Sequence, residues 1–345
     1  MRRLPTLEHQ TYVTYIGTTS GVYRLTDGGV GLLGHRSERI SALDAWRDGG
    51  DTIVLAGSYG AGVYRSANGG RTWEPANTGL TASTVRCLAA DPLQPGALLA
   101  GTEPARLFRS LDGGGSWQEL AGITQIAGHE RWFLPYSPRA GALRNVYAPP
   151  HRPGLLFAAV EVGGLLRSED NGVTWACEPV IEDEDIHFIT GQPQEPDLLY
   201  AALGYAALPS RQGEGGRRQL GGVARSRDGG KTWRKVETDY TRAVFVPPTR
   251  PDLVLAGPAP QVGQGGRIAV SADSGETWLP ADAGLPTPMP DMVELFVAAP
   301  DATVWAICSG GRLLRSAPGE WFWRSALPGD TDLCVQSIAF ASGDS

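Results

Sequence analysis

Short apolar runs, each long enough for one β-strand, alternate along the whole chain with turns that contain glycine and proline. Runs of this length between such turns are typical of β-strands rather than of helices. Six of them lead a group of further strands and a seventh stands alone near the C-terminus. The pattern therefore predicts first strands at residues 39–45, 85–90, 144–148, 186–190, 243–246, 293–298 and 335–341.

The N-terminal end of the chain departs from this grouping, because it offers only three strands. These are expected at residues 11–17, 22–25 and 30–33. The run at residues 335–341 would supply the missing first strand of this N-terminal group. Such a pairing closes a ring of sheets and leaves no open sheet edge.

An eight-residue pattern, Ser-x-Asp-x-Gly-x-Thr-Trp, recurs between the strands. Five copies, in which Asn replaces Asp once and Ser replaces Thr once, begin at Ser66, Ser110, Ser168, Ser226 and Ser271. Degenerate copies lie at residues 25–29 and 316–323, which makes seven units. The Asp can accept hydrogen bonds from the amides of its own turn, and the Gly allows positive φ. Each copy is therefore predicted to be a turn between the third and fourth strands of a sheet.

The tryptophans that end these copies, together with Trp323, follow one another at 44, 45 or 58 residues. A period near 45 residues is that of a four-stranded propeller blade, and the longer spacings indicate two insertions. The sequence thus predicts an all-β fold: a single domain over residues 1–345, a seven-bladed β-propeller of four-stranded blades, closed by the C-terminal strand in the N-terminal blade.

The repeated turn resembles the Asp-box, or bacterial neuraminidase, repeat of sialidases, oligoxyloglucan-type glycoside hydrolases, sortilin-type receptors and photosystem II assembly factors. The resemblance covers nearly the whole chain and implies the propeller. It implies little about function, since the box is a turn on the rim. The Arg-Ile-Pro signature and arginine triad of sialidases, which have six blades, are not found. Neither is the catalytic aspartate pair of the oligoxyloglucan hydrolases, which have two propellers.

Composition narrows the possible partners. A net charge of −7 argues against nucleic acid. No apolar stretch approaches the length of a membrane span, and no signal-peptide core follows Met1, so a cytoplasmic protein is expected. The four cysteines lack metal-ligand spacing and are expected to be reduced.

Ligands of propellers bind in the axial funnel, on the face that carries the loops into the first strands. Both insertions, at residues 121–143 and 204–221, are expected on this face. Arginines near the first strands can bind a carboxylate or phosphate, or can hold neighbouring blades together. Aromatic residues of the insertions can stack on a ligand or anchor the loop. The predicted ligand-binding residues are Arg86, Arg131, Trp132, Tyr136, Arg144, Tyr205 and Arg242.

Histidines and carboxylates are expected on the same face. His35, His129 and His187 are candidate ligands for a divalent or transition metal, although each can equally be a structural residue. Glu103 and Glu161, at the ends of second strands, join His129 and His187 as candidate catalytic groups. The acidic run at residues 182–185 can instead be a solvated loop.

Two functions are consistent with these residues. One is an enzyme, a hydrolase or lyase, that processes a small molecule or glycan in the funnel, and the position of the histidines and insertions favours it. The other is a non-catalytic scaffold that binds a protein or peptide, like the assembly-factor and receptor propellers. A module whose face is covered by a second copy of the chain is a third possibility.

Overall fold

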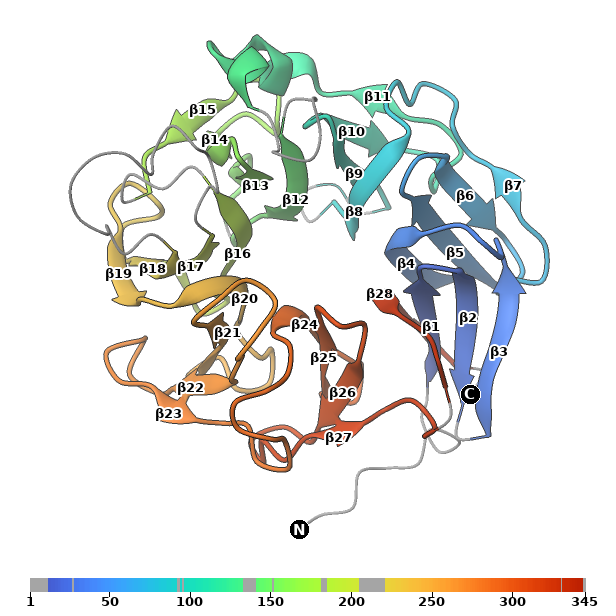
Figure 1. Cartoon of the computed structure of the whole chain (residues 1–345). Coiled ribbons are helices and arrows are strands. Elements are labelled where there is room, and N and C mark those ends of the chain that lie inside the picture. The colour runs from blue at the N-terminus through green and yellow to red at the C-terminus, as the bar shows by residue number, and fades with distance from the viewer. Residues whose placement is uncertain are drawn as a thin grey trace.

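The computed structural model describes residues 12–26, 28–91, 94, 96–132, 141–150, 152–180, 185–204, 221–329 and 331–343. The strands form seven antiparallel four-stranded sheets arranged as the blades of a ring (Figure 1). This confirms the predicted seven-bladed propeller. Among the described residues, helix is limited to the 3-10 segments η2 (Ala121–Gln125) and η3 (His129–Arg131), and neither is long or apolar enough to cross a bilayer.

Each blade runs outward from an inner strand that faces the central channel. From inside to outside, blade 1 comprises β28 (Val335–Ser342), β1 (Tyr12–Thr18), β2 (Gly21–Thr26) and β3 (Gly29–Gly34), and blade 2 comprises β4 (Ile40–Asp48), β5 (Asp51–Ser58), β6 (Gly62–Ser66) and β7 (Glu74–Pro75). Blade 3 comprises β8 (Thr84–Ala90), β9 (Leu98–Glu103), β10 (Leu107–Ser110) and β11 (Gln118–Glu119). Blade 4 comprises β12 (Ala142–Tyr147), β13 (Leu156–Glu161), β14 (Gly164–Ser168) and β15 (Ala176–Glu178).

The remaining three blades follow the same order. Blade 5 comprises β16 (Ile186–Gln192), β17 (Glu195–Leu203), β18 (Gly222–Ser226) and β19 (Arg234–Glu237). Blade 6 comprises β20 (Tyr240–Phe245), β21 (Val254–Ala259), β22 (Ala269–Ser271) and β23 (Leu279–Pro280). Blade 7 comprises β24 (Val293–Ala298), β25 (Val304–Cys308), β26 (Leu313–Ser316) and β27 (Arg324–Ser325).

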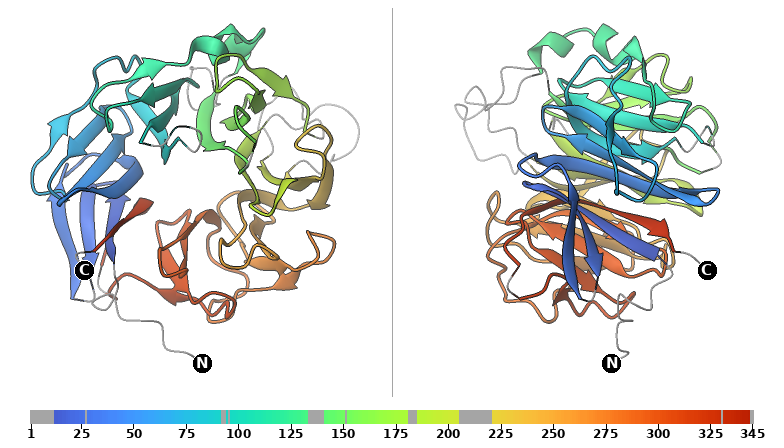
Figure 2. Two further views of the ribbon diagram at one scale, coloured as in Figure 1. Left: turned by 180° about the vertical axis from the view of Figure 1, so that it is seen from behind. Right: turned by 90° about the vertical axis from the view of Figure 1, so that its right-hand side faces the viewer.

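The ring closes as the sequence predicts, because β28 pairs antiparallel with β1 and makes blade 1 from both ends of the chain. Figure 2 shows β28 lying beside β1 on the channel side of that blade. Ile338 of β28 packs with Ile16 of β1 and Trp305 of blade 7. The C-terminal strand therefore contributes both backbone pairing and apolar burial to the closure.

Apolar packing lies mainly between blades. Each pair of adjacent blades shares one main cluster of buried side chains, such as that of Leu55 and Val63 from blade 2 with Val85 and Phe108 from blade 3. The blades approach so closely that a Cβ on Gly57 would lie 2.6 Å from Val85. A larger residue at position 57 would force the blades apart.

The repeated eight-residue segments form the predicted turns between third and fourth strands. In the copy that begins at Ser168, the amide of Gly172 donates to the Ser168 hydroxyl at 2.9 Å. The amide and hydroxyl of Thr174 donate to Asp170 at 2.8 and 2.6 Å. The other complete copies repeat this pattern, with Asn68 in place of the Asp in the first. The polar side chains of these segments therefore form hydrogen bonds within their own turns, which indicates a structural role.

Candidate functional site

All seven inner strands share an irregularity near their first residues. In each, the pairing with the second strand shifts register, so that an additional residue is left out of the regular ladder. Such β-bulges redirect side chains. Each irregular segment contains one polar residue, and these seven residues line one axial cavity of about 610 Å³: Ser41, Arg86, Arg144, His187, Arg242, Glu294 and Gln336. We call this the ring cavity.

Arginine and glutamate side chains of the ring cavity form direct ion pairs. Arg86 lies 2.7 Å from Glu103, at the end of β9, and Arg144 lies 2.9 Å from Glu161, at the end of β13. Arg242 lies 2.6 Å from Glu294 on the neighbouring blade. Each carboxylate is therefore held by a guanidinium.

Longer contacts join these pairs to one another. The Nη2 of Arg86 is 3.7 Å from Glu161, which connects blades 3 and 4. The Nη2 of Arg144 is 3.8 Å from Glu294, although blades 4 and 7 are not neighbours. The side chains therefore bridge the channel at this level.

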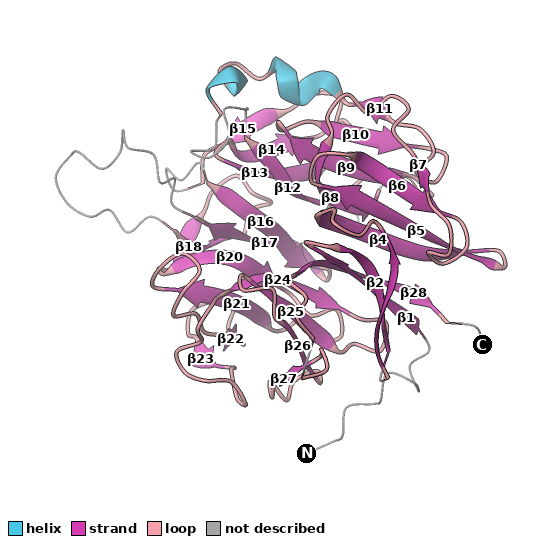
Figure 3. Cartoon of the chain, turned by 45° about the vertical axis from the view of Figure 1, so that its right-hand side comes forward, coloured by secondary structure: helices cyan, strands magenta, loops and turns pink. Residues whose placement is uncertain are grey.

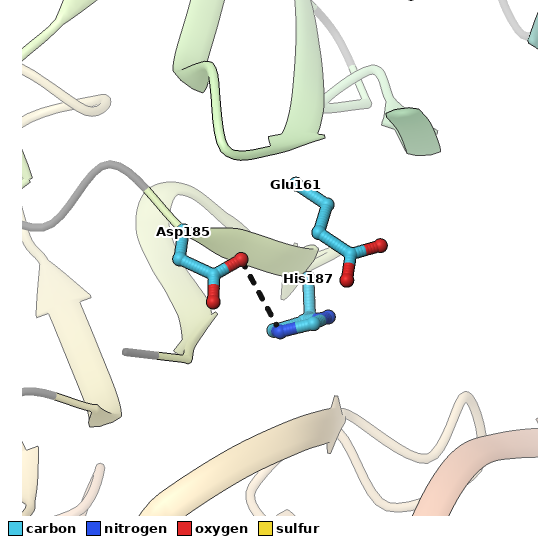
Figure 4. Close-up of side chains that lie close together, drawn as sticks. All are labelled: Glu161, Asp185 and His187. Carbon is cyan, nitrogen blue, oxygen red and sulfur yellow. Dashed lines mark ion pairs between the residues drawn. The ribbon is translucent and has the colours of Figure 1, made fainter. Parts of the chain in front are cut away.

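We call these linked ion pairs, with the groups that contact them, the arginine network. Hydrogen bonds extend the network to blades 5 and 6. The Nε of Arg242 donates to the Tyr240 hydroxyl at 2.7 Å, and that hydroxyl is 3.2 Å from the Nε2 of His187. The same Nε2 lies 3.4 Å from Asp185. Figure 4 shows Asp185, His187 and Glu161 directed toward one region.

Contacts on the opposite side extend the network to blades 1 and 2. The Tyr59 hydroxyl donates to Glu103 at 3.3 Å. The guanidinium of Arg39 lies over the Tyr59 ring, 4.7 Å from its centroid, and donates to Gln336 at 2.8 and 3.1 Å. One continuous chain of polar contacts thus links all seven blades.

The surrounding charges shift the pKa values of Glu161, Arg86 and Arg242. Burial alone would raise the pKa of Glu161, but Arg144, His187, Arg86 and Arg242 outweigh burial and hold it well below its usual range. Burial and nearby Arg144 lower the pKa of Arg86. Burial would also lower that of Arg242, but Glu294 raises it above its usual value. Glu161 is therefore ionised at neutral pH.

Metal binding has one candidate set among the described residues. Glu161, Asp185 and His187 each place one ligand atom within 4.8 Å of the others. Two carboxylates and an imidazole suit a divalent cation in composition. However, the charge of Glu161 is already compensated by Arg144 and Arg86, which would repel a cation. The donor set fits a metal poorly for this reason.

Six of the sequence-predicted site residues come together in the network: Glu103, Glu161, His187, Arg86, Arg144 and Arg242. The predicted set of three histidines does not come together. His35 stacks on Tyr64, with ring centroids 3.8 Å apart, and does not line the ring cavity. His129 lies on η3, and Figure 3 shows the helical segments outside the ring of strands.

Two other predicted insertion residues, Arg131 and Trp132, also lie away from the ring cavity. Trp132 packs against Gly141 and the turn between β13 and β14, so it anchors the insertion to blade 4. Arg131 is exposed to solvent, and its Nε is 3.8 Å from Glu130. Tyr136 and Tyr205 lie outside the described residues.

Glu294, Tyr240, Tyr59 and Arg39 belong to the network but were not predicted. Glu294 falls inside the run at residues 293–298, which reads as an ordinary apolar strand. A signal was available nonetheless. A polar residue stands near the start of every inner strand, and a comparison of these positions would have identified Glu294 with the arginines.

No family model and no curated protein matches the chain. Solved structures match its fold. The GH74 xyloglucanase from Xanthomonas campestris is 20% identical with a TM-score of 0.65, and the match covers 99% of this chain and 54% of that one. YCF48 bound to the D1 peptide is 16% identical with a TM-score of 0.53, covering 91% and 99%.

Sqt1 from Chaetomium thermophilum, bound to the N-terminus of the ribosomal protein L10, is 13% identical with a TM-score of 0.55, covering 92% of this chain and 84% of that one. The chain spans only 38 to 54% of the length of three GH74 enzymes. At these identities the likeness shows the fold alone. The fold and site define a seven-bladed propeller with a charged network across its axis.

Proposed function

We propose that this propeller is a non-catalytic binding protein that takes an acidic segment of a partner protein into the ring cavity. This proposal rests on the charged side chains of the cavity wall. Four arginines and two glutamates line it: Arg39, Arg86, Arg144, Arg242, Glu161 and Glu294. Glu103 and Asp185 belong to the network but not to this lining. At the surface of the cavity, an acidic segment therefore meets four guanidinium groups and two carboxylates.

The arginines are suited to this role because each can make several hydrogen bonds at once. A guanidinium carries five N–H donors in a fixed plane, and a single carboxylate uses at most two of them. The side chains of Arg144 and Arg242 are 21 and 22% exposed, so part of each is accessible from the cavity. A carboxylate of the partner can therefore approach the exposed part of each guanidinium.

Catalysis by the carboxylates is supported less well. Glycoside hydrolysis requires one carboxylic acid that is protonated near the working pH, which means a raised pKa. The pKa of Glu161 is instead held below its usual range, and Glu103 and Glu294 are both paired with arginines. The geometry therefore favours binding over the enzyme function that the sequence favoured.

The structural neighbours give independent support. YCF48 and Sqt1 match this chain over most of both lengths, and both are described in complex with a peptide or a protein N-terminus. The GH74 enzymes are about twice as long as the part that matches. The repeated turns also resemble those of Asp-box propellers, a group to which we propose that this chain belongs.

An array of fluorescein-labelled peptides that spans acidic, neutral and basic sequences would test the proposal. We expect acidic peptides to bind best, and the affinity of the best one to fall about tenfold in Arg242→Gln, which corresponds to about 1.4 kcal/mol. Arg250→Gln is the matched control, because Arg250 is exposed and paired with Asp252 away from the ring cavity. Equal affinity in Arg242→Gln, or no preference for acidic peptides, would overturn the proposal.

A further inference from the structure

The channel contains a second cavity on the other side of the arginine network. It has a volume of about 830 Å³, and its wall continues along all seven inner strands to the turns near Pro248 and Pro300. Most of its lining is aliphatic or aromatic. The aromatic side chains are Tyr147, Phe188, Phe245, Phe296 and Phe340. We call this the apolar cavity. It is distinct from the ring cavity to which we assign the acidic segment.

One carboxylate lies in this apolar wall. Asp44, on β4, is the sole acidic residue of the lining among the described residues. Its Oδ1 accepts a hydrogen bond from the Ala45 amide at 2.9 Å. Burial raises the pKa of Asp44, and the hydrogen bond from the Ala45 amide opposes it. Among the residues that the structure describes, no cationic side chain is paired with Asp44.

The two positive groups of the lining do not supply that charge. Arg86 and Arg144 line both cavities, and they are paired with Glu103 and Glu161 respectively. An ionised carboxylate in apolar surroundings without a cation is costly. Within the described part of the chain, the apolar cavity thus presents a carboxylate without a cationic partner.

We propose that the apolar cavity binds a small organic ammonium compound, with its cationic nitrogen at Asp44 and its apolar body against the aromatic side chains. The carboxylate supplies the opposite charge, and aromatic rings attract ammonium groups. The volume lies within the range of small-molecule sites. The two cavities share Arg86 and Arg144 in their linings, but Asp44 lines the apolar cavity alone, so this site uses a carboxylate that the acidic-segment site does not.

Aliphatic and aromatic members of this class are simple probes. Isothermal titration calorimetry with phenethylamine, octylamine and benzyltrimethylammonium would measure binding, and 2-phenylethanol serves as the neutral counterpart of phenethylamine. We expect at least one ammonium compound to bind with one-to-one stoichiometry and about tenfold more tightly than the alcohol, since a tenfold ratio needs only about 1.4 kcal/mol from the charge pair.

Asp44→Asn should remove this preference, while Asp48→Asn is the matched control, because Asp48 is exposed at the end of the same strand. The Asn variant should fold. Because the pKa of Asp44 is raised in the folded state, its ionised form destabilises the fold at neutral pH, and the neutral amide avoids this. Its melting temperature should match or exceed that of the wild type at pH 7.

The wild type provides a second readout that needs no variant. Ammonium affinity should fall as the pH falls through the pKa of Asp44, because only the carboxylate attracts the cation. The other titratable groups of the lining stay in one state there: Arg86 and Arg144 remain charged, and burial raises the pKa of Cys87 and Tyr147 to about 12. Absence of binding by all three amines, equal binding of the alcohol, or unchanged affinity in Asp44→Asn would each overturn the proposal.

Discussion

Arg144 of blade 4 and Glu294 of blade 7 meet across the axis of the propeller, with Nη2 and Oε2 3.8 Å apart. Neither blade is adjacent to the other, so this contact joins parts of the ring that share no sheet edge and no apolar cluster. Arg144 also holds Glu161 of its own blade at 2.9 Å. One guanidinium thus serves two carboxylates from different blades.

Removal of Arg144 should therefore affect stability more than removal of an exposed arginine. Arg144→Gln leaves Glu161 and Glu294 with one fewer partner, and we expect it to lower the free energy of unfolding by about 2 kcal/mol. The full cost of a broken buried pair is not expected, because the Arg144 side chain is 21% exposed. Urea unfolding followed by tryptophan fluorescence would measure it.

Arg152→Gln is the control for this prediction. Arg152 pairs with Asp197, and both side chains are nearly half exposed. Its loss should change the free energy of unfolding by less than about 0.5 kcal/mol. Equal effects of the two substitutions would mean that the network across the channel adds nothing to stability.

The repeated turns should make the fold sensitive to acid. The hydroxyl and amide of Thr174 hold the pKa of Asp170 at about 2, and equivalent threonines hold those of Asp228 and Asp273 at about 2. An unfolded aspartate titrates at about 3.9. Since these pKa values are lower in the folded state than in the unfolded state, the ionised aspartates stabilise the fold fully above about pH 4. This contribution to the free energy of unfolding is lost as the pH falls toward 2.

Thr174→Val isolates this effect. It removes the hydroxyl bond to Asp170, so the pKa of Asp170 should rise and acid unfolding should begin at a higher pH. Thr72→Val removes the equivalent contact to Asn68, whose amide does not titrate. Its stability loss should be the same at pH 7 and pH 3. Tryptophan fluorescence during acid titration would follow unfolding of both variants. A loss of stability that does not depend on pH in either variant would contradict the prediction.

Ring closure by the C-terminal strand gives a further prediction. Ile338→Ala empties part of the cluster between blades 7 and 1 and should cost about 2 to 4 kcal/mol. Leu111→Ala, at a side chain that is 64% exposed, should cost less than about 0.5 kcal/mol. Chemical denaturation of both variants would decide, and a small cost at Ile338 would show that β28 is dispensable for closure.

The fold could be predicted closely from the sequence because each blade repeats one pattern of strands and turns. The strand expected at residues 293–298 is β24 with the same bounds, and the expected closure at residues 335–341 is β28. Arg144 shows the limit. It was expected to begin its strand, whereas β12 begins at Ala142 and Arg144 occupies the bulge.

The candidate site could be predicted only in part, for related reasons. Position at a strand end located Arg86, Arg242 and Glu161, but alternation of apolar and polar residues does not reveal bulges, so Glu294 was missed. The length of an insertion does not indicate its direction either. His129 was therefore expected near the axis, although η3, which carries it, lies outside the ring of strands.

Binding of an acidic segment in the ring cavity is tested most directly by the arginine side chains themselves. NMR spectra of protein labelled with ¹⁵N-arginine, assigned by Arg→Lys substitution, would be recorded while the best acidic peptide from the array is added. The Nε–H signals of Arg144 and Arg242 should shift with saturation, and that of Arg250 should not. Saturable peptide binding that leaves the signals of Arg144 and Arg242 unmoved would contradict the proposed function.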